Sequence, residues 1–179
     1  MLDYILIGMV FDEPLTGYDI KKEIEAGIGN FYKASYGSLY PALKKLTEKE
    51  YLTMTERPQG ARVKKYYEAT ELGRSVFLAW LSAPFDPRVD GDALLAMIYF
   101  YGVLPEDIRN RRLEEHELHL RQVLGQLQAI EKSVLTSHAE KEDYFMVSTL
   151  YYGIQNVHVA IRWIRYIRDQ KPLTEFVRE

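Results

Sequence analysis

The sequence predicts a mainly α-helical protein with a small β-hairpin wing: an N-terminal winged helix-turn-helix followed by a C-terminal dimerisation domain of long helices. The first observation is the order of short segments before residue 86, which reads helix, helix, helix, hairpin, helix. The second is the change, beyond that point, to long stretches with apolar residues at helical spacing. The segment from Pro84 to Pro87 separates the two patterns, so we expect one domain at residues 1–86 and another at residues 87–179.

Composition narrows the classes of protein to which the chain could belong. Its 179 residues suffice for one large or two small domains, and 47% hydrophobic with 27% charged residues is ordinary for a globular protein. The chain has no cysteine, which excludes disulfides and thiolate metal sites and suits a reducing cytoplasm. The apolar run at residues 4–11 is too short to span a membrane and no basic residue precedes it, so neither a membrane anchor nor a signal peptide is expected.

The net charge of −3 conceals a basic segment. Between Lys33 and Lys65 the chain has eight basic and three acidic side chains, a balance of +5, so the remainder carries −8. A local cluster of positive charge on an acidic protein attracts phosphate groups if its members converge in space. The alternative is a solvated surface of mixed charge.

The first two helices are predicted from apolar periodicity and capping residues. Residues 4–11 could form a buried strand or a buried helix, and we expect a short helix, for which Asp3 is a plausible N-cap. Thr16 is the expected N-cap of the next helix, with Asp19 three residues later as the capping-box acid. An inward stripe follows at every fourth position: Ile20, Ile24 and Ile28.

The segment at residues 31–46 is the expected recognition helix with its lead-in. Three leucines form its core face: Leu39, Leu43 and Leu46. Pro41 lacks an N–H and is tolerated only near the start of a helix, so we expect the N-cap of this helix at Gly37 or Ser38, after an irregular lead-in at residues 35–36. Such a start exposes hydroxyls and backbone N–H groups, which suit a phosphate.

Two segments around a glycine-containing turn predict the hairpin of the wing. Residues 52–57 form the first strand, residues 58–61 the turn, and residues 62–69 a second strand rich in basic and aromatic side chains. Thr70 is the expected N-cap of a further helix that ends by Pro84. Its inward face is expected to comprise Leu72, Val76, Ala79 and Trp80.

Long helices are expected in the second half. After a short apolar segment at residues 90–101, one long helix is predicted at residues 105–136 and another at residues 140–170. Along the first of them apolar residues recur every seven positions, at Leu113, Leu120, Leu127 and Val134. This spacing is typical of antiparallel helix packing or of a coiled-coil dimer.

Several motifs, in order, resemble those of the PadR family of bacterial transcriptional regulators. They are Leu15-Thr16-Gly17-Tyr18-Asp19-Ile20, the stretch from Ser35 to Leu46 with its Leu-Tyr-Pro-x-Leu centre, and Gly60, Arg62, Lys65, Tyr66, Tyr67, Thr70 and Gly73. The resemblance covers about the first 85 residues, while the second half is similar to the longer subfamily only in length and helical content. Glu50 stands where the family usually has glycine, so the corner after the recognition helix is expected to be built differently.

The resemblance implies a homodimer that binds an inverted-repeat operator in double-stranded DNA, usually as a repressor, on the nucleoid of a bacterial cytoplasm. The C-terminal helices would form the dimer, and a small aromatic or phenolic ligand would release the DNA. Each recognition helix would enter a major groove about one helical turn from its partner.

The expected DNA contacts combine polar groups for base edges with cations for phosphates. The expected DNA-binding residues are Ser35, Tyr36, Gly37, Ser38, Tyr40, Lys44, Lys45, Arg62, Lys64 and Lys65. The alternatives are that the lysines are solvated and that the tyrosines pack internally. The alternative function is a winged-helix module for protein–protein contact without DNA binding, although a basic wing is atypical of an interface centre.

Aromatic residues crowd the second half, which suits a small-molecule pocket. The candidate effector-binding residues are Tyr99, Tyr152, His158, Arg162 and Trp163. His158 and Arg162 lie one helical turn apart and could bind an acidic group. The alternative for the aromatic residues is a hydrophobic core or a dimer interface.

The sequence has no motif typical of catalysis or of metal binding. His116 and His119 are three residues apart, not four as in the His-Glu-x-x-His zinc motif. Gly27 and Gly29 lack the third glycine of a nucleotide-binding loop, and the chain has neither a P-loop nor a nucleophile elbow. We therefore expect that the chain is not an enzyme and that it binds neither a metal nor a cofactor.

Overall fold

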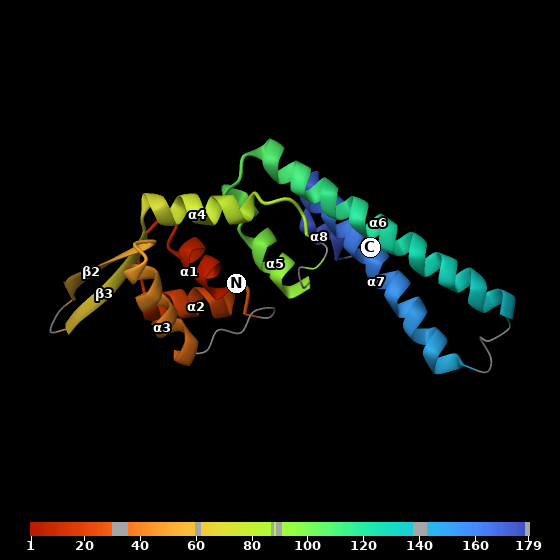
Figure 1. Cartoon of the computed structure of the whole chain (residues 1–179), viewed down its shortest axis with the longest axis horizontal. Helices are drawn as coiled ribbons and strands as arrows, with labels where there is room; N and C mark the ends of the chain where they lie inside the picture. The colour runs from red at the N-terminus through yellow and green to blue at the C-terminus, as the bar shows by residue number, and fades with distance from the viewer. Residues whose placement is uncertain (30–35, 60–61, 87, 89–90, 138–142, 178–179) are drawn as a thin grey trace. The chain divides into compact units, whose positions relative to one another are not determined.

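The computed structural model describes residues 1–29, 36–59, 62–86, 88, 91–137 and 143–177 (Figure 1). For Tyr36, Arg62, Asp92 and Ser137 it describes the backbone but not the side chain. The chain forms two compact units, Met1–Leu104 and Pro105–Glu179.

The first unit is a winged helix. Its helices are α1 (Leu2–Met9), α2 (Gly17–Ala26), α3 (Tyr36–Glu48), α4 (Glu71–Leu81) and α5 (Gly91–Tyr99), followed by the short 3-10 helix η1 (Tyr101–Val103). Its strands β1 (Leu15–Thr16), β2 (Leu52–Gln59) and β3 (Arg62–Ala69) form an antiparallel sheet in the order β1-β3-β2. The predicted fold class, mainly helical with a small wing, is confirmed.

The core of this unit is aliphatic and surrounds α1, which contacts α2, α3 and α4. Its largest fully buried side chains come from four helices, one strand and the segment after α2: Ile5, Leu6, Ile7, Ile20, Ile24, Ile28, Leu39, Leu43, Leu46, Leu52, Phe77 and Leu81. The leucine stripe of α3 and the isoleucine stripe of α2 are therefore inward, as their spacing predicts. Burial of this many large side chains is the main stabilising term for the unit.

The capping predictions have different outcomes at α1 and α2. Thr16 caps α2 as predicted, because its Oγ1 accepts a hydrogen bond from the Asp19 N–H at 3.2 Å. Asp3 does not cap α1, which begins at Leu2 after Met1. The Asp3 carboxylate instead pairs with Lys45 of α3 at 2.7 Å.

The late start predicted for α3 is wrong. The helix begins at Tyr36, so Pro41 lies inside it, in its second turn. An N–H at position 41 would have bonded to the Gly37 carbonyl. Gly37 is exposed, so water can satisfy that carbonyl, and the ordinary cost of an interior proline is reduced.

Glu50 forms the corner between α3 and β2. Its φ of 58° lies in the left-handed region that favours glycine. The N–H of Tyr51 donates to the Leu46 carbonyl and that of Glu50 to the Thr47 carbonyl, both at 3.0 Å, which closes the helix. The expectation of a differently built corner is wrong, because the chain adopts the glycine-type conformation with a glutamate.

The sheet differs from the predicted hairpin in two respects. Strand β2 continues to Gln59, whereas the sequence predicts a turn that begins at Pro58. The sheet also gains β1, in which Leu15 and Thr16 pair with Tyr67 and Tyr66 of β3. A two-residue strand has no alternation from which it could be predicted, because its partner lies far away in sequence.

The predicted inward face of α4 is also wrong. Thr70 caps the helix as expected, accepting from the Gly73 N–H at 2.9 Å, but the buried residues are Gly73, Phe77 and Leu81, and Leu72 is exposed. Gly73 packs against the backbone of Tyr51, so closely that a Cβ at this position would lie 2.0 Å from the Tyr51 carbonyl oxygen. The close approach of the two backbones thus fixes which side of α4 faces inward.

The first unit extends beyond the predicted division at residue 86. Phe100, just after α5, packs edge-to-face on Phe77 of α4, with ring centroids 5.3 Å apart. A Cβ on Gly8 of α1 would lie 2.7 Å from the Phe100 ring. These contacts place α5 and η1 in the unit that ends at Leu104.

The second unit is an antiparallel pair of long helices, as predicted (Figure 1). Helix α6 (Glu106–Ser137) packs along α7 (Tyr144–Arg168), and the short α8 (Leu173–Phe176) returns against α7. Leu113 of the heptad series is buried, and so are Ile154, Ile161 and Ile164 of α7. No helix in the described part of the chain is long and apolar enough to cross a membrane.

Candidate nucleic-acid interface

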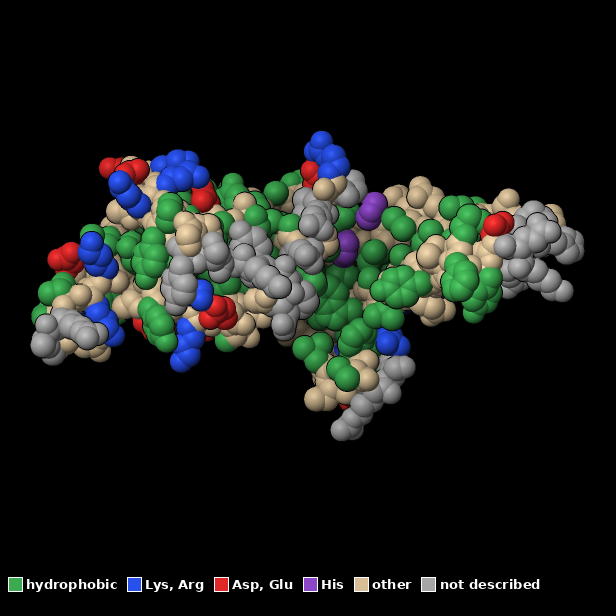
Figure 2. Space-filling view, turned by 90° about the horizontal axis from the view of Figure 1, so that it is seen from below, with side chains coloured by type: hydrophobic (Ala, Val, Ile, Leu, Met, Phe, Trp, Pro, Cys, Tyr) green, Lys and Arg blue, Asp and Glu red, His purple; other side chains and the backbone are tan. Residues whose placement is uncertain are grey.

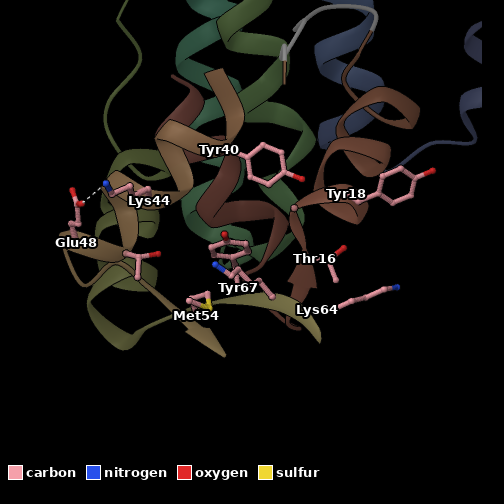
Figure 3. Close-up of a pocket in the computed structure, with 11 residues that line it drawn as sticks. Thr16, Tyr18, Tyr40, Lys44, Glu48, Met54, Lys64 and Tyr67 are labelled. Atoms are coloured by element: carbon pink, nitrogen blue, oxygen red, sulfur yellow. Dashed lines mark ion pairs between the residues drawn. The ribbon is translucent and has the colours of Figure 1, made fainter. Parts of the chain in front are cut away.

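A groove of about 770 Å³ lies in the first unit, between α3, the start of α2 and the wing (Figure 3). It is the place where parts of the chain that are distant in sequence converge on one exposed surface. Its lining residues are Thr16, Gly17, Tyr18, Tyr40, Lys44, Thr47, Glu48, Met54, Lys64, Lys65 and Tyr67.

Helix α3 contributes one wall because of its spacing. Tyr40, Lys44, Thr47 and Glu48 fall at helical intervals on the side away from the buried leucines. Strand β1 and the start of α2 supply the next wall, and the pairing of β1 with β3 holds it against the wing. The groove is thus formed by α3, by β1 with the start of α2, and by the strands of the wing.

Gly17 and Tyr40 are packed closely inside the groove. A Cβ on Gly17 would lie 2.8 Å from Tyr40 Cε1, so a side chain at position 17 would displace the tyrosine ring. Below them Tyr67 is only 9% exposed. Burial, and secondarily the neighbouring Tyr40, raises the pKa of Tyr67, so its phenol keeps its proton and can donate at neutral pH.

The cations of the groove are accessible. Lys44 pairs with Glu48 at 3.7 Å and Lys65 with Glu56 at 3.9 Å, and all four side chains are exposed. Exposed ion pairs of this kind contribute little free energy, so phosphate groups can replace the carboxylates. Figure 2 shows basic side chains interspersed with acidic ones on this unit, so any attraction for DNA must come from local convergence.

The structure brings together four of the predicted DNA-binding residues. Tyr40, Lys44, Lys64 and Lys65 all line the groove. Gly37 and Ser38 are exposed in the first turn of α3 but do not line it. Ser35 lies outside the described residues, as do the side chains of Tyr36 and Arg62, and the backbone of Arg62 pairs with Gln59.

Lys45 is a predicted DNA-binding residue of α3 that lies outside the groove. It does not line the groove, because it lies about 100° around α3 from Lys44. Its ammonium pairs with Asp3 of α1 at 2.7 Å, which stabilises the contact between α3 and α1. Lys45 therefore has a structural partner that must be given up before it can bind phosphate.

Sequence reasoning did not select seven of the groove residues: Thr16, Gly17, Tyr18, Thr47, Glu48, Met54 and Tyr67. From the sequence Tyr18 could be a core residue or a contact, and it is 64% exposed at the start of α2. The helical repeat through Tyr40 would have identified Thr47, seven positions later. The convergence of Tyr67 with α3 depends on the pairing of β1 with β3, for which the sequence has no signal.

The candidate effector residues are divided between the two units. Tyr99 belongs to the first unit and borders a cavity of about 350 Å³ together with Asp12, Glu13 and Glu23. Tyr152 and His158 are exposed on α7, whereas Trp163 is half-buried there. Arg162 lies 4.9 Å above the Phe176 ring of α8. Among the described residues no group of three or more His, Asp or Glu side chains could hold a metal ion.

Comparison with known families gives two matches, one for each half of the chain. The model described as the transcriptional regulator PadR-like family matches residues 6–79. The model described as the virulence activator alpha C-terminal region matches residues 92–170. The boundary predicted at residue 86 falls between these two matches.

Similar proteins include two regulators. The negative transcriptional regulator PadR of Bacillus subtilis is 25% identical over 174 residues, which are 93% of this chain and 95% of that protein. A probable transcriptional regulator of Mycobacterium tuberculosis is 23% identical over 91 residues, 50% of this chain and 48% of that protein.

Similar solved structures include two crystal structures of Bacillus subtilis PadR. The complex with operator DNA is 24% identical, covers 94% of this chain and 98% of that one, and has a TM-score of 0.47. The complex with p-coumaric acid is 24% identical, covers 94% and 97% of the two chains, and has a TM-score of 0.43. On the match over residues 6–79 and on the motifs of its first half, the chain contains a PadR-like domain, and the family is described as one of transcriptional regulators.

Proposed function

We propose that this chain is a dimeric, sequence-specific DNA-binding regulator, a repressor, whose groove between α3 and the wing binds double-stranded DNA at an inverted-repeat operator. The observation that carries the proposal is the convergence of Tyr40, Lys44, Lys64 and Lys65 from two elements on one exposed groove. A protein of this kind acts where the chromosome is, on the nucleoid in the bacterial cytoplasm.

The chemistry of the groove fits DNA. Lysine ammonium groups neutralise phosphates and release condensed counterions, which supplies affinity without sequence information. Sequence is read by hydrogen bonds to base edges, and α3 presents exposed Ser38 and Tyr40 for this purpose. Ser35 and Arg62 remain predicted contacts. The Bacillus subtilis relative is a negative transcriptional regulator that has been crystallised with operator DNA, so its partner is of the class proposed here.

The second unit would form the dimer, as the dimerisation domain expected for residues 87–179. Helix α7 exposes large apolar side chains along its length: Tyr144, Phe145, Met146, Tyr152 and Val159. Hydrophobic side chains are visible along this unit in Figure 2. Apolar patches of this kind typically mark interaction surfaces. A dimer would then fix the spacing of two recognition helices and so the distance between operator half-sites.

Release by a small aromatic or phenolic ligand completes the proposal. The Bacillus subtilis relative has also been crystallised in complex with p-coumaric acid, a ligand of this chemical class. Tyr99, Tyr152, His158, Arg162 and Trp163 remain the predicted effector-binding residues.

A titration of fluorescent DNA from the region upstream of the chain's own gene tests the proposal. We expect binding whose logarithm falls with the logarithm of the salt concentration, by about one unit of slope for each phosphate contact. The double variant Lys64→Glu, Lys65→Glu should lose at least about a hundredfold in affinity. The matched control is Lys132→Glu, Lys171→Glu, which changes the net charge equally with two exposed lysines of the second unit.

The same experiment addresses the alternative of a protein–protein module. Loss of DNA binding in the wing variant, with dimerisation retained in light scattering, supports DNA recognition. If the wild-type chain binds no DNA at low salt, or if wing and control variants weaken binding equally, the proposal is wrong.

A further inference from the structure

Two cations on the walls of the groove each have a carboxylate beside them. On α3, Lys44 Nζ lies 3.7 Å from Glu48 Oε1, and Figure 3 shows this pair at the edge of the groove. On the wing, Lys65 Nζ lies 3.9 Å from Glu56 Oε1, and the two residues are directly opposite each other in the pairing of β2 with β3. Side chains two positions apart on a strand share a face, so Glu56 is on the same face of β2 as Met54, which lines the groove.

The cations on the opposite face of the wing are arranged differently. Lys64, which borders the groove, stands opposite Arg57 in the same pairing of strands. Neither residue has an ion pair with a carboxylate within 4 Å among the described residues. The Arg57 guanidinium instead lies 4.8 Å from the centre of the Tyr66 ring. The glutamate partner on the wing thus belongs to the cation that faces the groove.

A phosphate that displaces these carboxylates does not remove them from the groove. Glu48 is attached to the last turn of α3 and Glu56 to β2, so both side chains stay close to a DNA backbone bound there. The three lysines of the groove carry a charge of +3, and the two glutamates reduce the local balance to +1. Like charges placed next to each other weaken association, whatever the sequence of the bases.

We infer that Glu48 and Glu56 limit the affinity of the groove for DNA of arbitrary sequence. Binding without sequence specificity depends almost entirely on phosphate contacts, and a genome offers about 10⁶–10⁹ competing sites of this kind. Weak binding at those sites leaves the protein available for the few sites at which α3 also contacts bases. The inference rests on the proposed function, because it assigns a role to two residues of the same DNA-binding surface.

Titration of a labelled duplex of random sequence at about 0.1 M salt tests this role, because charges more than about 10 Å apart are largely screened under this condition. The double variant Glu48→Gln, Glu56→Gln should bind this duplex at least about tenfold more tightly than wild type. The logarithm of its affinity should also fall more steeply with the logarithm of the salt concentration, by about one to two units of slope, as Lys44 and Lys65 become available to phosphates.

The matched control is Glu13→Gln, Glu25→Gln, which removes two exposed charges of the same unit that do not line the groove. Glu25 pairs with Lys21 at the same helical spacing as Glu48 with Lys44, so the control also loses one helical ion pair. It should change the affinity by less than about twofold. An equal gain in both variants would assign the effect to net charge and overturn the inference. So would unchanged affinity in the groove variant, or a failure of both wild type and groove variant to bind.

A duplex from the region upstream of the chain's own gene separates this inference from the proposed function. The groove variant should gain affinity for it by a similar factor, since the repulsion acts on phosphates of any sequence. A loss of affinity would mean that a glutamate accepts from a cytosine amino group, and the inferred role would be wrong. If wild type binds this duplex no more tightly than the random one, the proposed sequence-specific function fails, while the random duplex still decides the role of the two glutamates.

Discussion

At the scale of single residues, Glu50 is strained by its position at the corner after α3. A left-handed conformation is unfavourable for a residue with a Cβ and nearly free of cost for glycine. The side chain of Glu50 is exposed and has no ion pair within 4 Å among the described residues that would offset this cost.

Glu50→Gly should therefore stabilise the first unit, by about 0.5–1 kcal/mol, measured by urea denaturation. The matched control is Glu48→Gly, two residues earlier at the last position of α3, which should destabilise by about 0.5 kcal/mol because glycine is unfavourable in a helix. If the two glycine variants shift the unfolding midpoint in the same direction, the conformational explanation for Glu50 fails.

Gly73 is constrained by space. A Cβ would lie 2.0 Å from the Tyr51 carbonyl oxygen, which is backbone and cannot rotate away. We expect Gly73→Ala to destabilise the first unit by more than about 2 kcal/mol and to loosen the base of the wing. Gly125→Ala is the control, because that glycine lies inside α6 with open space around it and should gain about 0.5–1 kcal/mol. Thermal unfolding of both variants gives the comparison.

At the scale of elements, Glu117 joins α6 to α7. Its carboxylate is buried and accepts from Arg165 Nε at 2.8 Å and from Arg168 Nη1 at 2.9 Å, both on α7, and pairs with Arg121 at 2.9 Å. Glu117→Gln keeps the size and shape of the side chain but removes the negative charge that pairs with the guanidinium groups of Arg121, Arg165 and Arg168. The variant should lose about 2–4 kcal/mol of stability.

Glu114→Gln is the control for this prediction. Glu114 is exposed one turn earlier on α6, so its replacement should change stability by less than about 0.5 kcal/mol. Comparable losses in both variants would mean that the general charge of α6, and not the buried cluster, holds the two helices together.

His116 makes the second unit sensitive to acid. Burial, and secondarily the nearby His119, lowers the pKa of His116 from 6.5 to about 4. The unfolded chain therefore binds a proton at this residue before the folded chain does. The contribution of neutral His116 to the free energy of unfolding is fully present above about pH 6.5. It is lost as the pH falls toward 4, by at most about 1.4 kcal/mol per pH unit.

Thermal unfolding of wild type and His116→Gln between pH 7 and pH 4.5 checks this expectation. The wild-type melting temperature should fall more steeply than that of the variant. Parallel curves would show that His116 is not the group responsible.

At the scale of the whole molecule, the exposed face of α7 is the candidate dimer contact. Phe145 is 83% exposed and Tyr152 70% exposed, although the opposite face of α7 packs on α6. Large aromatic side chains are seldom so exposed. Phe145→Glu, Tyr152→Glu should convert a dimer to monomers in light scattering, because burial of charge at an interface is unfavourable. Val177→Glu, an equally exposed position outside α7, should leave the dimer intact.

Much of the fold could be predicted from the sequence because it follows local rules. The leucines of α3, the isoleucines of α2 and the caps at Thr16 and Thr70 are set by spacing and by hydrogen bonds within four residues. The start of α3 could not be predicted from Pro41, because the cost of an interior proline depends on whether water reaches the orphaned carbonyl.

The groove could be predicted only in part, since it is a product of long-range contacts. Lys44, Lys64 and Lys65 were identifiable from charge and order, but Lys45 looks the same in sequence and is instead paired with Asp3. Tyr67 and Thr16 converge because β1 pairs with β3, a contact between segments separated by about fifty residues. The pattern of apolar residues in neither segment predicts that pairing.

The two-residue strand β1 also has an evolutionary consequence. Its residue Thr16 pairs with β3, caps α2 and lines the groove, so one residue serves three purposes at one backbone register. An inserted residue between Leu15 and Gly17 would turn Thr16 to the opposite side of the sheet and remove the cap as well. Lineages that diverge from this chain should vary in length elsewhere and keep this spacing unchanged.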